Sequence, residues 1–216
     1  MSDELEATSH TGGSEDDTLA VSQTGNENVA ITNYGTVHMQ VNQNFRGLPR
    51  SDGQFYVPAQ INREYYNIFV IRGEKFDKPF FRMPRERALS GSMSSETRER
   101  FPGVSESDKK QIVTMPSLFM DENHQYGNAD AGQKAIYGFV SDYKIYDNEV
   151  KVYWCGYRLD IPQIRLNQLL DELQLSGDDR LNEMNRTHWA IKRCDLMQEL
   201  QEAGIDIPVF THGTVD

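Results

Sequence analysis

The sequence lacks the features that mark secreted, membrane-spanning and disulfide-rich proteins. None of its 216 residues belongs to a run of about 18 apolar residues, the length that a membrane-spanning helix needs. Only two cysteines are present, Cys155 and Cys194, and they are not in a CxxC spacing. The first ten residues carry three acids, no Lys or Arg and no apolar stretch, which argues against a secretory signal. We therefore expect a soluble, cytoplasmic protein with no membrane partner.

Motifs of common enzyme classes are also missing. The chain has no glycine-rich phosphate loop, no GxSxG nucleophile motif and no cluster of metal-ligating cysteines. His124 follows Asp121 by three residues without a second histidine nearby, a pattern typical of turns. His188 beside Trp189 is typical of a hydrogen-bonded packing residue. We predict no metal site and no cofactor, and the sequence favours a binding protein over an enzyme.

Charge is distributed unevenly along the chain, whose formal net charge is −11. Residues 1–44 contain seven acids and no Lys or Arg, whereas residues 45–110 contain thirteen bases against nine acids. Residues 111–216 contain nine bases against seventeen acids. Because affinity for nucleic acid comes mostly from neutralising phosphates, any polyanionic partner is expected to meet the central segment.

The N-terminal region divides into a tail and a series of short strands. Residues 1–18 are mostly Ser, Thr, Gly, Asp and Glu and are predicted to be a disordered acidic tail. Residues 19–44 are rich in Asn and Gly and alternate apolar and polar residues, which predicts a short β-ribbon or solenoid-like extension. Its apolar stripe consists of Leu19, Val21, Val29, Ile31, Val37, Met39 and Val41. This stripe either mediates self-association with identical ribbons or lies along the main domain as an extra sheet.

Residues 45–216 are predicted to form one α+β domain with a mixed or antiparallel sheet and two to three helices. Residues 67–73 read as a buried strand, and residues 136–146 and 149–155 as a hairpin whose turn is Asp147-Asn148. A helix is expected from Pro162 to Gly177, with leucines at helical spacing. Residues 185–192 are expected to form a turn and a strand, followed by a helix capped by Asp195.

A basic segment between these elements, at about residues 74–111, is predicted to be a long, irregular, mobile loop. It contains a short helix near residues 84–89 and interleaves arginines with phenylalanines. Its candidate residues for binding phosphate or a partner are Arg82, Arg85, Arg87, Arg98 and Arg100. Such a composition suits a phosphate, nucleotide or single-stranded nucleic acid site. In the alternative interpretation, Phe76, Phe80, Phe81 and Phe101 anchor the loop to the core while the arginines pair with Glu86, Glu96 and Glu99.

One catalytic pattern is present in the hairpin. Asp142, Glu149 and Lys151 match the Asp…Glu-x-Lys spacing of metal-dependent nucleases, in which two carboxylates hold a divalent ion. With a two-residue turn, however, Asp142 faces Tyr153 and lies about 13 Å from Glu149 along the ladder, at ~3.3 Å per residue. That separation is too large for one metal ion unless a bulge or a longer loop changes the register.

Several segments resemble uncharacterised bacterial proteins: residues 69–73, 115–119, 137–142 and 185–192. The Thr/Gly/Asn tract resembles short leaders of bacterial conflict and anti-phage proteins. The resemblance implies an accessory role in such a system and transfers no catalytic residue. Our leading hypothesis is a non-enzymatic, oligomerising binding or adaptor protein with a protein partner. The alternative is a metal-dependent nuclease or a nucleotide sensor that uses the Arg-rich loop.

Overall fold

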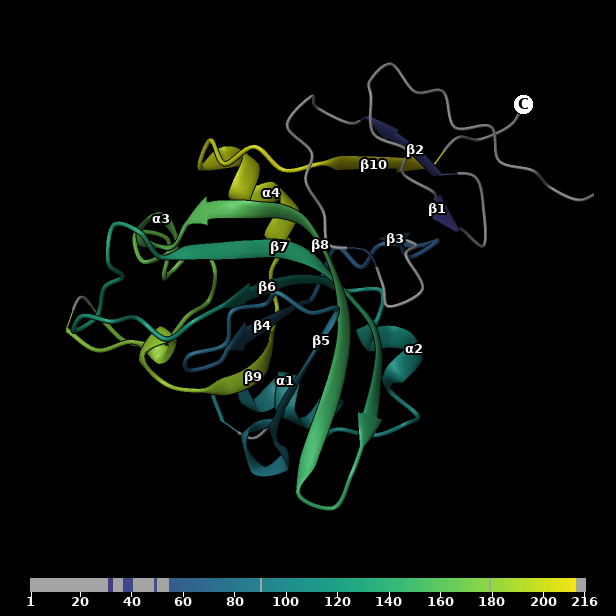
Figure 1. The fold of residues 1–216 in the computed structure, drawn as a ribbon, viewed down its shortest axis with the longest axis horizontal. Coiled ribbons are helices and arrows are strands. Elements are labelled where there is room, and N and C mark those ends of the chain that lie inside the picture. Colours follow the sequence, from purple (N-terminus) through teal and green to yellow (C-terminus); the bar gives the residue numbers. More distant parts are fainter. Residues whose placement is uncertain are drawn as a thin grey trace, which may run out of the picture.

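The fold is organised around one six-stranded mixed β-sheet. The computed structural model describes residues 31–32, 37–40, 49, 55–89, 91–178 and 180–212. The strands of this sheet lie in the order β5–β8–β7–β6–β4–β9, and the sheet is strongly curled (Figure 1). They are β4 (Tyr66–Val70), β5 (Phe80–Pro84), β6 (Pro116–Met120), β7 (Lys134–Ile145), β8 (Glu149–Pro162) and β9 (His188–Lys192). All neighbours pair antiparallel except β4 and β6, which are parallel.

Short helices surround this sheet. Within the described ranges they are α1 (Ser95–Arg100), α2 (Lys109–Ile112), α3 (Gln163–Leu166) and α4 (Leu196–Glu202), with 3-10 helices η1 (Arg85–Arg87) and η2 (Glu183–Asn185). The predicted α+β class with a mixed sheet is therefore confirmed. None of the helices in these ranges has the length and hydropathy needed to cross a bilayer.

The β7–β8 hairpin forms as the sequence predicts. Tyr146 N–H donates to the Glu149 carbonyl at 2.8 Å, which leaves Asp147-Asn148 as the two-residue turn. Asp142 lies opposite Tyr153 and Lys144 opposite Lys151, in the predicted register. β8 continues beyond the predicted strand end at residue 155 and runs for 14 residues. Near the turn, buried and more exposed positions alternate along β8 because successive side chains point to opposite faces, whereas every residue from 135 to 140 of β7 is buried.

Irregular pairing in the middle of the hairpin allows the sheet to curl. The register shifts between Val140 and Asp142 and again on both sides of Tyr137. Gly138 pairs with Gly156 there, and a Cβ at Gly138 would lie 2.0 Å from the Cys155 carbonyl oxygen, so only glycine fits. The curl brings the two edges together, since Leu89 N–H donates to the Trp189 carbonyl of β9 at 2.8 Å, just after β5 and η1.

Aromatic rings fill the inside of the curled sheet. Phe69 on β4 lies 5.4 Å from Phe81 on β5, although three strands separate them in the sheet order. Phe69 also stacks on Phe119 at 5.1 Å and on Trp189 at 4.9 Å. The predicted buried strand at residues 67–73 is confirmed as β4, in which all five residues are buried. These offset and edge-on contacts make the ring cluster the rigid centre of the domain.

The prediction of an irregular loop at residues 74–111 is wrong. This segment contains β5, η1, α1 and α2, and the short helix expected near residues 84–89 is η1. Phe81 and Met83 alternate inward along β5, a period-two signal that the prolines and the serine-rich run obscured. Phe76 and Phe101 are buried as anchors, but Phe80 is only half-buried and lies outside the core.

The C-terminal part is predicted correctly except for one helix. The helix expected up to Gly177 ends at Leu166, because the following residues form turns from which Leu173 still reaches the core. Within residues 185–192, Asn185 ends η2 and residues 188–192 are β9, which agrees with the predicted turn followed by a strand. Asp195 caps α4 by accepting from Gln198 N–H at 3.2 Å, and Gly204 with φ +69° follows its end.

Two strands of the N-terminal ribbon fall within the described residues. β1 (Ile31–Thr32) pairs parallel with β3 (Phe55–Tyr56), and β2 (Val37–Gln40) pairs antiparallel with β10 (Val209–His212) of the same chain. Figure 1 shows β2 beside β10, next to α4. The tail at residues 1–18 and the stripe residues Leu19, Val21, Val29 and Val41 lie outside the described residues. Self-association through the ribbon stays a prediction.

Candidate polyanion-binding face

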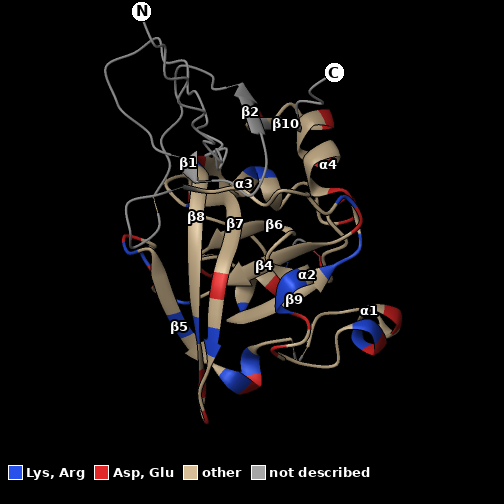
Figure 2. Cartoon of the chain, turned by 90° about the vertical axis from the view of Figure 1, so that its right-hand side faces the viewer, with Lys and Arg blue, Asp and Glu red and all other residues tan. Residues whose placement is uncertain are grey.

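Strands β5, β8 and β7 carry charged and aromatic side chains on their outward face near the hairpin turn. The strand register orders nine residues into three rungs across the strands. The rungs are Phe80–Tyr153–Asp142, Arg82–Lys151–Lys144 and Pro84–Glu149–Tyr146. We call these nine residues the basic face. Figure 2 shows blue Lys and Arg positions on β5 and toward the hairpin end of β7 and β8.

The middle rung places three cations directly opposite one another. Arg82 is paired in register with Lys151, and Lys151 with Lys144. Like charges in opposite positions of neighbouring strands destabilise a sheet, so this arrangement disfavours the fold in isolation. Arg82 forms an ion pair with Glu149, whereas no ion pair of Lys144 or Lys151 is found among the described residues. The Lys151 Nζ instead lies 3.8 Å from the ring centroid of Phe80 and 4.7 Å from that of Tyr153.

The two acids of the basic face are engaged by other cations. Asp142 Oδ1 lies 3.0 Å from Lys109 Nζ, which also pairs with Glu106 at 2.8 Å. Burial lowers the pKa of Lys109, but the hydrogen bonds to Glu106 and Asp142 outweigh it and leave that pKa above its usual value. Glu149 is held by Arg82. Lys144 and Lys151 are therefore the cations of the basic face for which the described residues supply no acidic partner, whereas Arg82 shares its charge with Glu149.

A shallow, open hollow lies beside the middle rung, between the end of β5 and the hairpin turn. Arg82, Tyr146 and Glu149 are among the residues that line it, and the Arg82 guanidinium lies 5.4 Å from the Tyr146 ring centroid. Arg85 N–H donates to the Asn148 carbonyl at 3.0 Å, which fixes η1 against the turn. Arg85 and Arg87 are exposed. Three of the five arginines predicted to bind phosphate thus gather at this end of the sheet.

The other two predicted arginines lie elsewhere and have local partners. Arg98 Nη2 donates to the Gly91 carbonyl at 2.8 Å, and Arg100 Nη2 donates to Gln111 Oε1 at 2.6 Å. Both belong to α1, which Figure 2 places apart from β5. The partner of Glu96 on α1 is Arg193, at 2.6 Å, rather than an arginine of the basic segment. The basic segment is therefore not one continuous phosphate site.

The three nuclease candidates lie on the basic face without converging on a common point. Asp142 is opposite Tyr153, four positions along β8 from Glu149, which corresponds to about 13 Å at ~3.3 Å per residue. Each contacts another side chain: Asp142 contacts Lys109, Glu149 contacts Arg82 and Lys151 contacts Phe80. In the described ranges, no group of three or more His, Cys, Asp or Glu residues is arranged to hold a metal ion.

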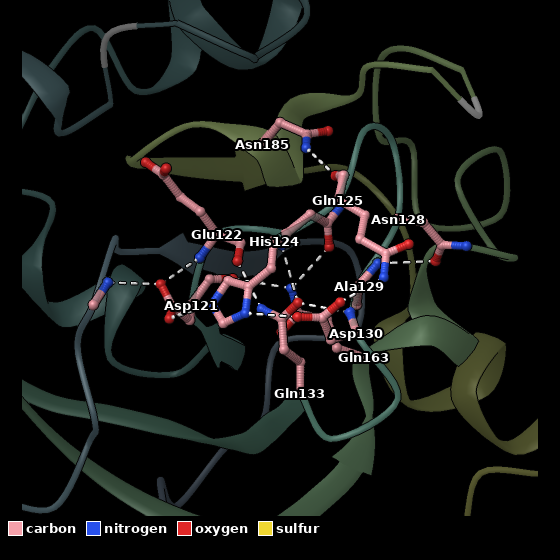
Figure 3. A network of polar contacts seen from close by, with 12 residues as sticks. Asp121, Glu122, His124, Gln125, Asn128, Ala129, Asp130, Gln133, Gln163 and Asn185 are labelled. Carbon is pink, nitrogen blue, oxygen red and sulfur yellow. Dashed lines mark hydrogen bonds and ion pairs between the residues drawn. The ribbon is translucent and has the colours of Figure 1, made fainter.

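A second polar cluster occupies the loop between β6 and β7 (Figure 3). His124 Nδ1 lies 3.0 Å from Asp130 and its Nε2 lies 3.2 Å from Asp121. These hydrogen bonds, to Asp121 first and then to Asp130, raise the pKa of His124. Gln133 Oε1 accepts from the backbone N–H of both His124 and Asp130, at 3.0 and 2.8 Å. The network fixes a loop that presents Tyr126, whose residue surface is 88% exposed.

A third cluster is buried beside β9. Lys192 Nζ lies 2.6 Å from Glu183 Oε1, and His188 Nε2 lies 3.4 Å from Glu183 Oε2, with the carboxylate fully buried. Burial alone would raise the pKa of Glu183, but His188 and the charge of Lys192 outweigh it and hold that pKa below its usual value. The His188 ring also contacts the Arg186 carbonyl through Nδ1 at 2.9 Å, which confirms the predicted packing role.

The sequence pattern points to Arg82 of the basic face as a phosphate ligand but not to its neighbours across the strands. The composition of the basic segment predicts Arg82, Arg85 and Arg87 as phosphate ligands and gives no role to Lys144 and Tyr153, and the nuclease-like spacing is the only pattern that includes Lys151. The alternation of β5 would have shown that Phe80 and Arg82 share an outward face.

Comparison with protein-family models, curated proteins and solved structures finds no match to the chain. The basic face thus combines cations with aromatic rings on paired strands.

Proposed function

We propose that this protein is a non-enzymatic binding protein whose basic face binds a partner carrying phosphate groups. The observation that carries the proposal is the middle rung, in which Arg82, Lys151 and Lys144 lie side by side. A cross-strand row of like charges weakens the sheet, and features that oppose local stability are expected at functional sites. Phosphate oxygens would relieve the repulsion among the cations, and the exposed Arg85 and Arg87 would add guanidinium donors.

Charge reversal on the middle rung tests this proposal. The probe is long-chain inorganic polyphosphate, which supplies phosphates without bases or lipid. We expect the Lys144→Glu/Lys151→Glu variant to bind it at least tenfold more weakly than the wild type. The control variant, Lys75→Glu/Lys134→Glu, changes the net charge equally at two exposed positions outside the basic face. Equal affinities for the two variants, or no binding by the wild type, would refute the proposal.

We further propose self-association through residues 19–44 and, from the resembling segments, an accessory role in a bacterial anti-phage system. The apolar stripe supports the first part. Light scattering on the full chain is expected to give a mass above that of one 24.8 kDa chain, and the Val21→Asp/Val29→Asp variant a lower one. A single-chain mass for the wild type would exclude self-association. Phage plating on cells that express the protein with its native neighbouring genes tests the second part.

A further inference from the structure

The cations of the basic face lie against exposed aromatic rings. Lys151 lies over both Phe80 and Tyr153, Lys144 Nζ is 5.8 Å from the Tyr153 ring centroid, and Arg82 covers Tyr146. The ring centroids of Phe80 and Tyr153 are 6.1 Å apart at an interplanar angle of 55°. The rings therefore lie on the two outer rungs, Phe80 and Tyr153 on one and Tyr146 on the other, and the middle rung between them supplies positive charge beside all three.

These three rings contribute little to the fold. Phe80 and Tyr153 are half-buried, Tyr146 is 43% exposed, and the core of the described residues includes none of them. Inward neighbours on the same strands, Phe81 and Val152, are buried in that core. Rings on a solvent-exposed sheet face, at positions where polar residues would suffice, can stack on a flat ligand once the long side chains of Lys151 and Arg82 move from the rings to the phosphates of that ligand.

We infer that the ligand of the basic face is single-stranded nucleic acid, an inference that rests on the proposed function and names its partner. The phosphates lie along Arg82, Lys151 and Lys144, and the bases stack on Phe80, Tyr153 and Tyr146. Three rings accommodate about three bases. A duplex keeps its base faces stacked inside and would meet the cations alone, whereas an unpaired strand uses both cations and rings. Stacking on a ring face is tolerant of base identity, so we expect weak sequence preference.

Separate variants of the rings and of the cations distinguish this inference from the broader proposal. Fluorescence anisotropy measures binding of a labelled 12-nucleotide oligo(dT) or oligo(rU), a 12-base-pair duplex and anionic phosphatidylserine vesicles, with polyphosphate as competitor. We expect the single strands to bind more tightly than the duplex and the vesicles. With three phosphate contacts, the slope of log affinity against log salt is expected to be about −2.

Removing the rings is the decisive step. Phe80→Leu/Tyr153→Leu is expected to weaken oligo(dT) binding by roughly five- to 150-fold per ring and to leave polyphosphate binding unchanged. Tyr126→Leu removes an exposed ring outside the basic face and serves as the matched control. Phe80→Tyr/Tyr153→Phe keeps both rings and is expected to retain wild-type binding. If the leucine variant does not fold, Tyr146→Leu at the exposed turn tests the same point.

Failure of the single-strand inference and failure of the proposed function give different results. If the wild type binds polyphosphate but the oligonucleotides no more tightly than the duplex, or if ring removal has no effect, the single-strand inference is wrong and the proposed function stands. Tighter binding to the vesicles than to the oligonucleotides would likewise overturn the inference in favour of a membrane surface. If neither polyphosphate nor oligonucleotide binds, the proposed function fails as well.

Discussion

The buried ion pair between Lys192 and Glu183 provides a sharp test of the fold. Lys192→Met keeps the length of the side chain and removes its charge. The side chains of Glu183 and Lys192 are 0% and 5% exposed, so the variant leaves a carboxylate in the interior without its main counter-charge. Breaking a buried pair on one side costs about 3–5 kcal/mol, a large part of the total stability of a typical domain. Lys192→Met/Glu183→Gln removes both charges, keeps an acceptor for Ser176 N–H, and should recover most of that loss.

The pH dependence follows from the lowered pKa of Glu183. A carboxyl group whose folded-state pKa is below its unfolded value of about 4.3 contributes stability above that value, and the contribution is lost as the pH falls through the folded-state pKa. In Lys192→Met the isolated Glu183 takes up a proton more easily because burial raises its pKa, so the deficit relative to the wild type should shrink as the pH falls from 7. Urea unfolding followed by the fluorescence of the buried Trp154 and Trp189 measures both effects. If Lys192→Met lowers the free energy of unfolding by less than about 1 kcal/mol at pH 7, the stabilising role of the ion pair is contradicted. The same holds if Lys192→Met/Glu183→Gln is as unstable as Lys192→Met.

Two further predictions concern the hairpin and the β6–β7 loop. Gly138→Ala is expected to lower the free energy of unfolding by about 3 kcal/mol, measured with urea, because the new Cβ would meet the Cys155 backbone. Gly132→Ala is the control and should be nearly neutral, because open space surrounds Gly132. Equal losses in the two variants would argue against the close approach of Gly138 to Cys155. The raised pKa of His124 stabilises the fold fully below about pH 6.5, and this contribution is lost as the pH rises through the higher folded-state pKa. NMR titration of the His124 ring should therefore give a midpoint above 6.5 that falls in Asp130→Asn, and an unchanged midpoint would exclude the Asp130 contact.

Local patterns determined which parts of the fold were predictable. The turn of the hairpin and the register beside it were predictable because a two-residue turn fixes which residues lie opposite one another, and Asp142 opposite Tyr153 follows from that register. The strand ends were not: β7 begins two residues earlier than predicted and β8 continues seven residues further, past register shifts that no local pattern marks. β5 was missed because its five residues lie between proline-rich and serine-rich stretches, where composition indicates a loop. The helix expected beyond Leu166 was wrong because leucine spacing cannot distinguish a helix from successive turns that bury the same residues.

The candidate site was only partly predictable because it is assembled across strands. Arg82 is 62 residues from Lys144 and 69 from Lys151, and only the pairing of β5 with β8 brings them together. Arg98 and Arg100 look equivalent to Arg82 in the sequence, yet the chain turns away after η1 and places them on α1. The Glu183–Lys192 pair joins η2 to β9, and neither residue carries a local signal of burial.

The most direct test of the central claim is to map polyphosphate binding onto the protein by NMR. Side-chain signals of Lys144, Lys151 and Arg82 should shift together with the backbone amides of β5, β8 and β7 near the hairpin turn, at a midpoint that moves to higher polyphosphate concentration as salt is added. Signals of Arg98, Arg100 and Tyr126 should stay in place. Shifts confined to α1 or to the β6–β7 loop, with the middle rung unaffected at saturation, would contradict the claim that the basic face is the binding surface.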